Sequence, residues 1–149
     1  MTDRERFLLD AMLGTLATYL RMCGHDAAYA LDRGVEADDA VRALADREGR
    51  TLVTRDADLA ARTEGAIRLT ARDVEAQCEE LRAAGVRLSL PDRPRRCGRC
   101  NGRLERVDPT AETPDHAPDP SETRVWRCER CGTEFWIGSH WDDVARRLP

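Results

Sequence analysis

Four of the six cysteines have the spacing of a metal site. Cys97 and Cys100 form one Cys-x-x-Cys pair, Cys128 and Cys131 form a second, and 27 residues separate the pairs. A two-residue spacer lets both sulfurs of a pair face one ion, and zinc binds four thiolates tetrahedrally. Because four thiolates leave no open coordination position, this pattern predicts a structural zinc ion in a zinc ribbon, where two hairpins meet at one metal.

Two other chemistries are open to these pairs, namely redox-active dithiols and an iron or iron–sulfur centre. A redox pair would sit at a strand-to-helix turn, where neither pair is expected, so zinc is favoured. Gly102 and Gly132 follow the two pairs and are expected to permit the tight turn of each knuckle. The other two cysteines, Cys23 and Cys78, fall on predicted helix faces and are interpreted as buried small hydrophobes.

Aspartates make up the second group that could do chemistry. Asp10, Asp56 and Asp58 come just after apolar runs, and Asp38 stands at the front of a predicted helix. Hard oxygen ligands of this kind suit Mg²⁺ or Mn²⁺, which activate a water molecule and stabilise charge on a phosphodiester. Each aspartate taken alone also has a plain structural alternative, such as a helix cap or a turn.

The elements that must position these aspartates alternate between strand and helix. Short apolar runs predict the strands, and apolar residues at helical spacing predict the helices. This alternation predicts an α/β fold with a central parallel sheet covered on both faces, whose ligands bind at the carboxyl ends of the strands. The expected strands are 7–9, 27–30, 51–54 and 66–70, and the expected helices are 12–22, 36–45, a short one after 58, and 72–84.

A segment with two prolines, 91–94, predicts the boundary between an α/β domain at 1–90 and the zinc ribbon at 91–149. Within the ribbon, residues 108–123 hold four prolines and five acids and almost nothing apolar. A segment of that composition cannot bury a core. We therefore expect an acidic, proline-rich insertion that is disordered or loosely held.

The basic residues are unusual, because all 24 of them are arginine. The absence of lysine excludes a phosphate-loop lysine, a Schiff-base enzyme and a response-regulator receiver. The net charge of −4 hides a basic stretch at 93–106, with six arginines and one glutamate. This stretch is either a phosphate-backbone footprint or a solvated surface.

Further enzyme classes fit poorly. None of the three serines, Ser89, Ser121 and Ser139, lies in a Gly-x-Ser-x-Gly elbow. An aspartate-nucleophile phosphatase would want a second aspartate two residues after Asp10, where Met12 stands. The charged start is not a secretory signal and no apolar run is long enough for a membrane span, so a cytoplasmic protein is expected.

Three motifs together carry a resemblance to a known family. They are the segment 7–26, which includes Leu9-Asp10 and Leu20-Arg21; the segment 49–59, which includes Thr54-Arg55-Asp56; and the aromatic segment 135–141 after the second cysteine pair. In this order they resemble the predicted ribonuclease family named for the Mut-seven C-terminal domain (Mut7-C), part of the wider PIN-like nuclease fold. The resemblance implies a small PIN-like domain at 1–90 that holds a divalent metal with clustered acids.

Carried over residue by residue, the resemblance assigns the acid set. Asp10 matches the acid after the first strand, Asp56 the acid of the Thr-x-Asp turn, and Asp58 its neighbour. The helix at 38–45 resembles the one that brings a further acid, for which Asp38 is favoured over Asp39. The glutamate helix found mid-chain in larger PIN domains has no counterpart here.

Four arginines are expected to contact the substrate. Arg21 and Arg55 recur in the resembled motifs and flank the acids, and Arg96 and Arg99 lie in the basic stretch. Arginine binds phosphate oxygens bidentately. For Arg21 and Arg55 an ion pair that orients Asp10 or Asp26 is the alternative.

The aromatic segment 135–141 contains two tryptophans and a histidine. Trp136 and Trp141 are expected to pack against the ribbon, with base stacking as the alternative. His140 is interpreted as a structural hydrogen-bonding residue.

The leading functional hypothesis is a ribonuclease that uses Mg²⁺ or Mn²⁺, with the structural zinc ribbon helping to bind RNA. A ribosome or ribonucleoprotein is a further candidate partner. One alternative is a catalytically inactive module that binds RNA or the ribosome, and another is a toxin-like PIN nuclease. The sequence predicts no oligomeric state.

Overall fold

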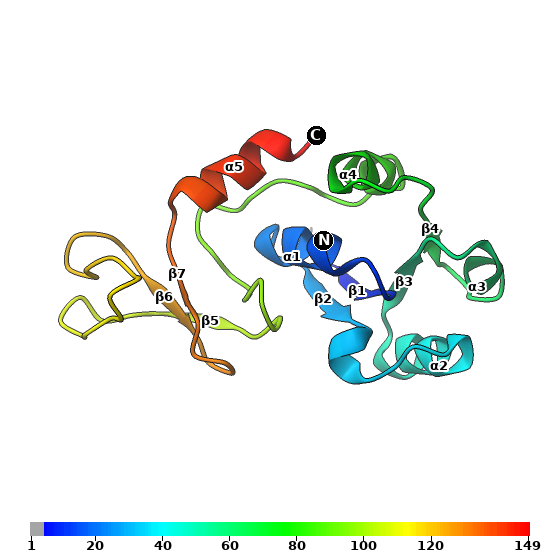
Figure 1. Ribbon diagram of the computed structural model, residues 1–149, viewed down its shortest axis with the longest axis horizontal. Coiled ribbons are helices and arrows are strands. Elements are labelled where there is room, and N and C mark those ends of the chain that lie inside the picture. The colour runs from blue at the N-terminus through cyan, green and yellow to red at the C-terminus, as the bar shows by residue number, and fades with distance from the viewer. Residues whose placement is uncertain (1–4) are drawn as a thin grey trace.

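Four short parallel strands form the sheet that carries the aspartates. The strands are β1 (Arg6–Leu9), β2 (Asp26–Tyr29), β3 (Thr51–Thr54) and β4 (Ile67–Arg68), and their order in the sheet is β2-β1-β3-β4. The computed structural model describes residues 5–149, and it confirms the α/β class and the parallel sheet expected from the sequence (Figure 1).

Helices cover both faces of the sheet, with α1 and α4 on one side and α2 and α3 on the other (Figure 1). Side chains alternate along each strand, so that Phe7 and Leu9 enter one core while Leu8 enters the other. All these side chains are fully buried. The helices are α1 (Gly14–Met22), α2 (Asp38–Glu48), α3 (Ala57–Ala61) and α4 (Val74–Ala83), and a 3-10 turn, η1, spans Leu31–Arg33.

The ribbon is a three-stranded antiparallel sheet with the order β5-β6-β7. Its strands are β5 (Leu104–Arg106), β6 (Trp126–Cys128) and β7 (Glu134–Phe135). The insertion 108–123 contains no helix or strand. It forms local turns instead, because Asp108 accepts hydrogen bonds from Thr110 and Asp119 accepts them from Ser121.

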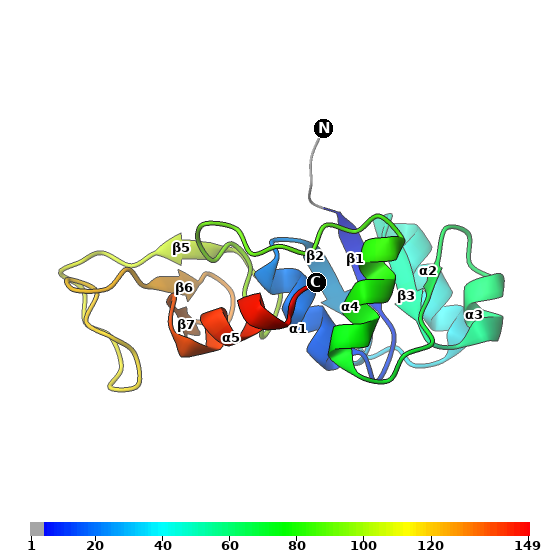
Figure 2. The same ribbon diagram turned by 90° about the horizontal axis from the view of Figure 1, so that it is seen from above.

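A helix that the sequence analysis missed returns from the ribbon to the α/β part. Helix α5 (Ser139–Arg147) follows β7 and runs back beside α1 and α4 (Figures 1 and 2). Its residue Val144 is 1% exposed and belongs to the core on the α1–α4 face. Val86 and Leu88 of the connecting segment join the same core. The boundary near residue 90 stays a prediction, and the two parts share one core.

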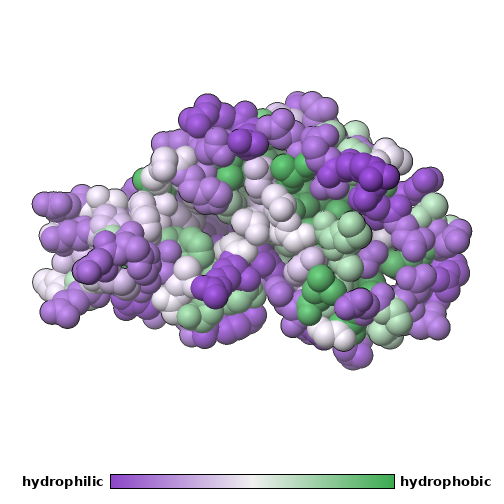
Figure 3. All heavy atoms as spheres, viewed as in Figure 1, coloured by the Kyte–Doolittle hydropathy of each residue, from purple (hydrophilic) through white to green (hydrophobic). Residues whose placement is uncertain are grey.

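Hydrophilic residues cover most of the face seen in Figure 3, and the outline is notched between the α/β part and the ribbon. Within residues 5–149, no helix combines the length and the apolar character needed to cross a membrane.

Candidate functional site

The aspartates Asp10 and Asp56 lie at one edge of the sheet, because β1 and β3 are adjacent and parallel. Thr54, which is fully buried, joins them. Its hydroxyl donates to Asp10 Oδ2 at 2.7 Å and accepts from the Asp56 backbone N–H at 3.0 Å. The other oxygen of Asp10 accepts from the Ala11 N–H at 2.8 Å. The first carboxylate of the expected site is therefore held firmly by its surroundings.

The aspartates after β3 also have structural work. Asp56 caps α3, since its Oδ1 accepts from the Leu59 N–H at 3.0 Å. Asp58 lies in the first turn of α3 and is exposed. A negative side chain is favourable at this end of a helix, so the plain structural role and a place at the sheet edge coexist here.

Asp38, which was also expected to bind the metal, forms an ion pair instead. Asp38 begins α2, and its carboxylate pairs with Arg62 Nη2 at 2.9 Å. Among residues 5–149, no three of the four expected acids bring their oxygens within 4.8 Å of one another. The acids therefore do not form a closed cage. A Mg²⁺ ion usually needs only one or two carboxylates, because it keeps several waters.

The four cysteines do converge. The sulfurs of Cys97, Cys100, Cys128 and Cys131 all lie within 4.8 Å of one another. The Cys97–Cys131 sulfurs are 3.6 Å apart and the Cys100–Cys128 sulfurs 3.5 Å apart. Four thiolates at zinc–sulfur distances of about 2.3 Å would sit roughly 3.8 Å apart in a tetrahedron. The donor set and its spacing fit a zinc ion.

Backbone amides and burial shape the chemistry of these thiols. The Cys100 N–H points at Cys97 Sγ at 3.4 Å, and the Arg130 N–H points at Cys128 Sγ at 3.3 Å. Burial raises the pKa of Cys97 to about 12. Burial also opposes ionisation of Cys131, but hydrogen bonds with Thr133, Cys97 and Cys100 together outweigh it and lower the pKa of Cys131 to about 6. A cation is what would hold the buried Cys97 as a thiolate.

A protein-family model covers nearly the whole of this arrangement. The model described as the Mut7-C RNAse domain matches residues 5–148, which include the sheet, the cysteine cluster and helix α5. The chain belongs to the Mut7-C RNAse domain family. No curated protein and no solved structure matched the chain.

In this Mut7-C chain, a polar network that the sequence analysis missed joins the first knuckle to the sheet. The side-chain amide of Asn101 donates from Nδ2 to Asp26 Oδ1 at 2.7 Å, and its Oδ1 accepts from the Ala27 N–H at 3.0 Å. Arg50 adds a further bond to Asp26 Oδ1 at 2.7 Å. Burial would raise the pKa of Asp26, but the bonds from Arg50 and Asn101 lower it to about 2. The only sequence signals were the family motifs 7–26 and 49–59, which contain Asp26 and Arg50 respectively.

Arg21 lies in the same region, away from the acids it was expected to flank. Its side chain is buried, with Nε donating to the Ala27 carbonyl at 2.7 Å and Nη1 to the Gly98 carbonyl at 3.0 Å. The acid nearest its guanidinium is Asp32, at 3.8 Å. These contacts favour a structural role for Arg21, with a partner other than the proposed Asp10 or Asp26.

Arg55 follows β3 and adjoins Asp56 in the chain. Burial opposes the ionisation of Glu80, but hydrogen bonds from the N–H groups of Ala71 and Thr70 and from the Thr70 hydroxyl, together with the positive charge of Arg55, lower the pKa of Glu80. Its Nε is buried and has no hydrogen-bond partner among residues 5–149. Arg55 therefore remains the phosphate-contact candidate at the sheet edge.

The glycines of the Mut7-C knuckles do not have equal roles. Gly132 has a φ of +77°, as expected for a tight turn. In the first knuckle, however, the left-handed residue is Asn101, with a φ of 72°. Gly102 is required for space, since a Cβ there would lie 2.7 Å from Cys128 Sγ.

The arginines of the basic stretch form a groove of about 500 Å³ along the ribbon, in front of Trp126. The guanidinium carbons of Arg106 and Arg124 lie 5.8 and 5.6 Å from the centre of the Trp126 ring. Arg96 is half-buried and bonds to the Asn101 carbonyl at 3.1 Å, while Arg99 is exposed. The arginines that line the groove are Arg93, Arg95, Arg96, Arg103 and Arg106.

Trp141, which was expected to pack against the ribbon, packs against the core on the α1–α4 face. It also lines a cavity together with Phe135 and Trp136, and it belongs to helix α5, which the sequence analysis did not foresee. His140 is exposed and forms no hydrogen bond with any residue from 5 to 149. The structural bond expected of His140 is therefore not seen.

Proposed function

We propose that this protein is a ribonuclease that depends on Mg²⁺ or Mn²⁺. The single observation that carries the proposal is the buried Thr54 hydroxyl, which joins Asp10 to the Asp56 turn at the edge of the sheet. The setting is a chain whose family is described as an RNAse domain. An aspartate pair at this edge has the donor chemistry that a hard divalent ion prefers.

In this proposal Asp10 is the principal metal ligand, with Asp56 and Asp58 beside it. A bound ion would supply an activated water and stabilise the charge on the phosphodiester. The chain itself holds Asp10 in place, because each carboxylate oxygen receives one hydrogen bond and keeps lone pairs free. Arg55, near the same edge, would bind a phosphate oxygen of the RNA.

The arginine groove would bind the RNA backbone at a distance from the site of cleavage. Five arginines line it, and none of them lies in the α/β part before residue 90. Contacts of this kind bind phosphates without reading sequence. The structural zinc ion would contribute by keeping the ribbon folded.

The test is cleavage of a mixed pool of structured RNA by the zinc-loaded protein, with Mn²⁺, with Mg²⁺ and with neither. We expect metal-dependent cutting that Asp10→Asn abolishes and that Asp56→Asn strongly reduces. Asp38→Asn and Asp39→Asn form a matched pair on the first turn of α2. Loss of cutting in the Asp38 variant alone would place Asp38 at the metal, whereas equal activity of both would leave it as the partner of Arg62.

One observation favours a second candidate, an inactive module that binds RNA or a ribonucleoprotein. Asp38 is paired with Arg62, and the described acids do not converge in a group of three. If the wild-type protein binds the RNA pool but never cuts it with either metal, this second candidate replaces the first.

A further inference from the structure

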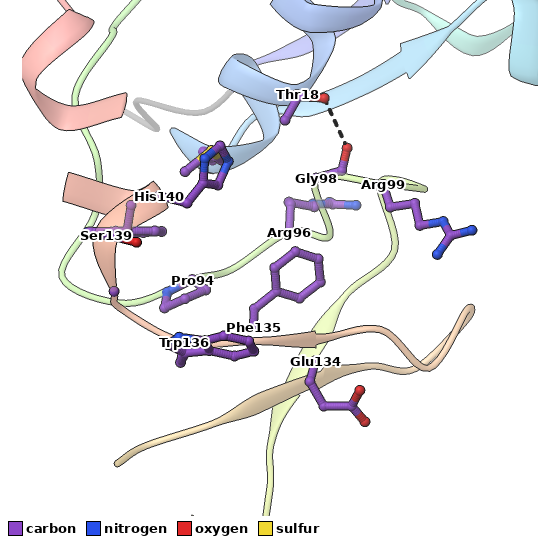
Figure 4. Close-up of a pocket in the computed structure, with 13 residues that line it drawn as sticks. Thr18, Pro94, Arg96, Gly98, Arg99, Glu134, Phe135, Trp136, Ser139 and His140 are labelled. Carbon is purple, nitrogen blue, oxygen red and sulfur yellow. Dashed lines mark hydrogen bonds between the residues drawn. The ribbon is translucent and has the colours of Figure 1, made fainter. Parts of the chain in front are cut away.

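A cavity of about 480 Å³ lies where the α/β part, the first knuckle and α5 meet (Figure 4). Its walls are largely apolar and aromatic. Phe135 points from β7 toward Arg96 and the knuckle, and Trp136 lies beneath Pro94 (Figure 4). His140 and Thr18 close the other side. The volume falls in the range of small-ligand sites.

The aromatic wall is fixed in place by neighbouring backbone. A Cβ on Gly138 would lie 2.9 Å from the indole nitrogen of Trp136, so only glycine allows the ring to sit there. The carbonyl of Gly98, on the opposite wall, is held by Thr18 Oγ1 at 3.3 Å and by Arg21 Nη1 at 3.0 Å. The cavity is therefore preformed, which reduces the cost of ordering it around a ligand.

The polar groups around the cavity suit an anionic ligand. The side chain of Arg99 is exposed at the wall and forms no hydrogen bond or ion pair with residues 5–149. The one nearby acid, Glu134, is already bound to Arg127 at 2.8 Å and points to the far side of β7 (Figure 4). The indole N–H of Trp136 also has no hydrogen-bond partner in the part of the chain that the structure describes. A flat ring with polar edges and an attached phosphate matches these features.

The cavity lies beside the arginine groove, and Pro94 and Arg96 line both. We propose that this cavity binds an unpaired base of an RNA strand whose phosphate backbone follows the arginine groove. The base stacks on Phe135 and Trp136, and Arg99 contacts its phosphate. Because the groove and the cavity are neighbours, a strand can occupy both at once, which a free nucleotide cannot do. The proposal rests on the proposed function for RNA as the substrate.

The test uses a 12-nucleotide single-stranded RNA that carries 2-aminopurine at one position, moved along the strand, with zinc-loaded protein and no added Mg²⁺ or Mn²⁺. Stacking quenches this base, so we expect quenching on binding at one position. Phe135→Leu keeps an apolar side chain but removes the ring. We expect it to abolish the quenching and to weaken binding about 5- to 150-fold, the effect of losing one base–aromatic stack.

Two variants protect the test against misfolding. Gly138→Ala should displace the Trp136 ring and weaken the quenching without removing any aromatic group. Ile137→Ala, an exposed neighbour that does not line the cavity, should behave like the wild type. Wild-type binding without quenching at any position would overturn the proposal. Quenching as strong as that of the wild type in both the Phe135 and the Gly138 variants would also overturn it. So would displacement of the strand by free AMP at equal nucleotide concentration.

Failure of the proposal and failure of the proposed function give different results. Quenching without any metal-dependent cleavage supports the base site and removes the nuclease. Cleavage by a protein whose quenching does not depend on Phe135 or Gly138 keeps the nuclease and overturns the base site.

Discussion

At the scale of single residues, the Thr54 hydroxyl is the most informative group of the molecule. It lies fully buried and serves one carboxylate and one backbone amide at once. The family motif predicted Asp10 and Asp56, and the geometry of adjacent parallel strands explains why they meet. The sequence motifs did not indicate that the Thr54 hydroxyl would set the relative position of the two aspartates.

Thr54→Val is the direct check, because it keeps the branched shape and removes the hydroxyl. Asp10 would lose a hydrogen bond and the Asp56 N–H its acceptor, so we expect a loss of about 1–2 kcal/mol in the free energy of unfolding. We also expect RNA cleavage to fall about tenfold or more. Denaturant unfolding and cleavage rates measure the two effects. Thr51→Val, on the same strand and half-buried, is the control and should be nearly neutral.

Asp26 gives a prediction for pH. Its pKa is lowered to about 2 in the folded protein, from 3.8 in the unfolded chain. A depressed carboxyl pKa contributes stability above the unfolded value, and that stability is lost as pH falls from about 4 to 2. The contribution is about 2 kcal/mol.

The measurement for Asp26 compares unfolding free energies of wild type and Asp26→Asn between pH 5 and pH 2. The zinc thiolates and other acids take up protons in both proteins, so the difference between the two curves is the quantity of interest. We expect the difference to shrink as the pH falls. A constant difference across this range would contradict the prediction.

At the scale of elements, the sequence predicted the four strands of the parallel sheet and four of the five α-helices within a few residues. These elements have strong local signals, such as apolar runs that end at Asp10 and Thr54. The missed helix α5 is short and largely polar, and its apolar contacts are Trp141, Val144 and, just after its end, Leu148. That spacing is helical, but the resemblance of the segment 135–141 to the end of a zinc ribbon favoured assigning these residues to the ribbon. The packing partners of α5 lie more than fifty residues away in the chain, so no local pattern reveals them.

The two knuckle glycines provide a matched pair of substitutions. In Gly102→Ala the added carbon would meet two cysteine sulfurs, at 2.7 and 3.3 Å. Gly132→Ala meets nothing within 4 Å and only strains the backbone. We expect zinc affinity, measured by competition with a chromogenic chelator, to fall at least tenfold in the first variant. The second should lose only about fivefold, since the left-handed conformation costs roughly 1 kcal/mol. Equal losses would mean that space around the sulfurs does not matter.

At the scale of the whole molecule, the ribbon and the α/β part behave as one body in their packing. The ribbon reaches the sheet through Asn101 and reaches the helical face through α5. The three tryptophans all lie after residue 90, whereas four of the five α-helices lie before it. Tryptophan fluorescence therefore reports on the ribbon and, through Trp141, on its contact with the α1–α4 core, whereas far-UV circular dichroism reports largely on the α/β part.

Val144→Ala tests this shared packing. It removes two methyl groups from a site that is 1% exposed, and we expect a loss of about 2 kcal/mol in the free energy of unfolding. Both spectroscopic signals should shift together. Arg146→Ala, on the exposed face of the same helix, should change the free energy by less than about 0.5 kcal/mol. A shift of the fluorescence transition alone would show that the two parts unfold separately.

The contact between Asn101 and Ala27 has a consequence for the protein without its metal. Strand β2 is the outermost strand on its side of the sheet, and Asn101 occupies one backbone amide on its open edge. An uncovered edge is a template on which a second chain adds a strand. If loss of zinc releases the knuckle, that edge becomes available, and molecules would associate through it. The metal would then act as a safeguard against aggregation, and zinc starvation would be seen first as loss of dispersed protein.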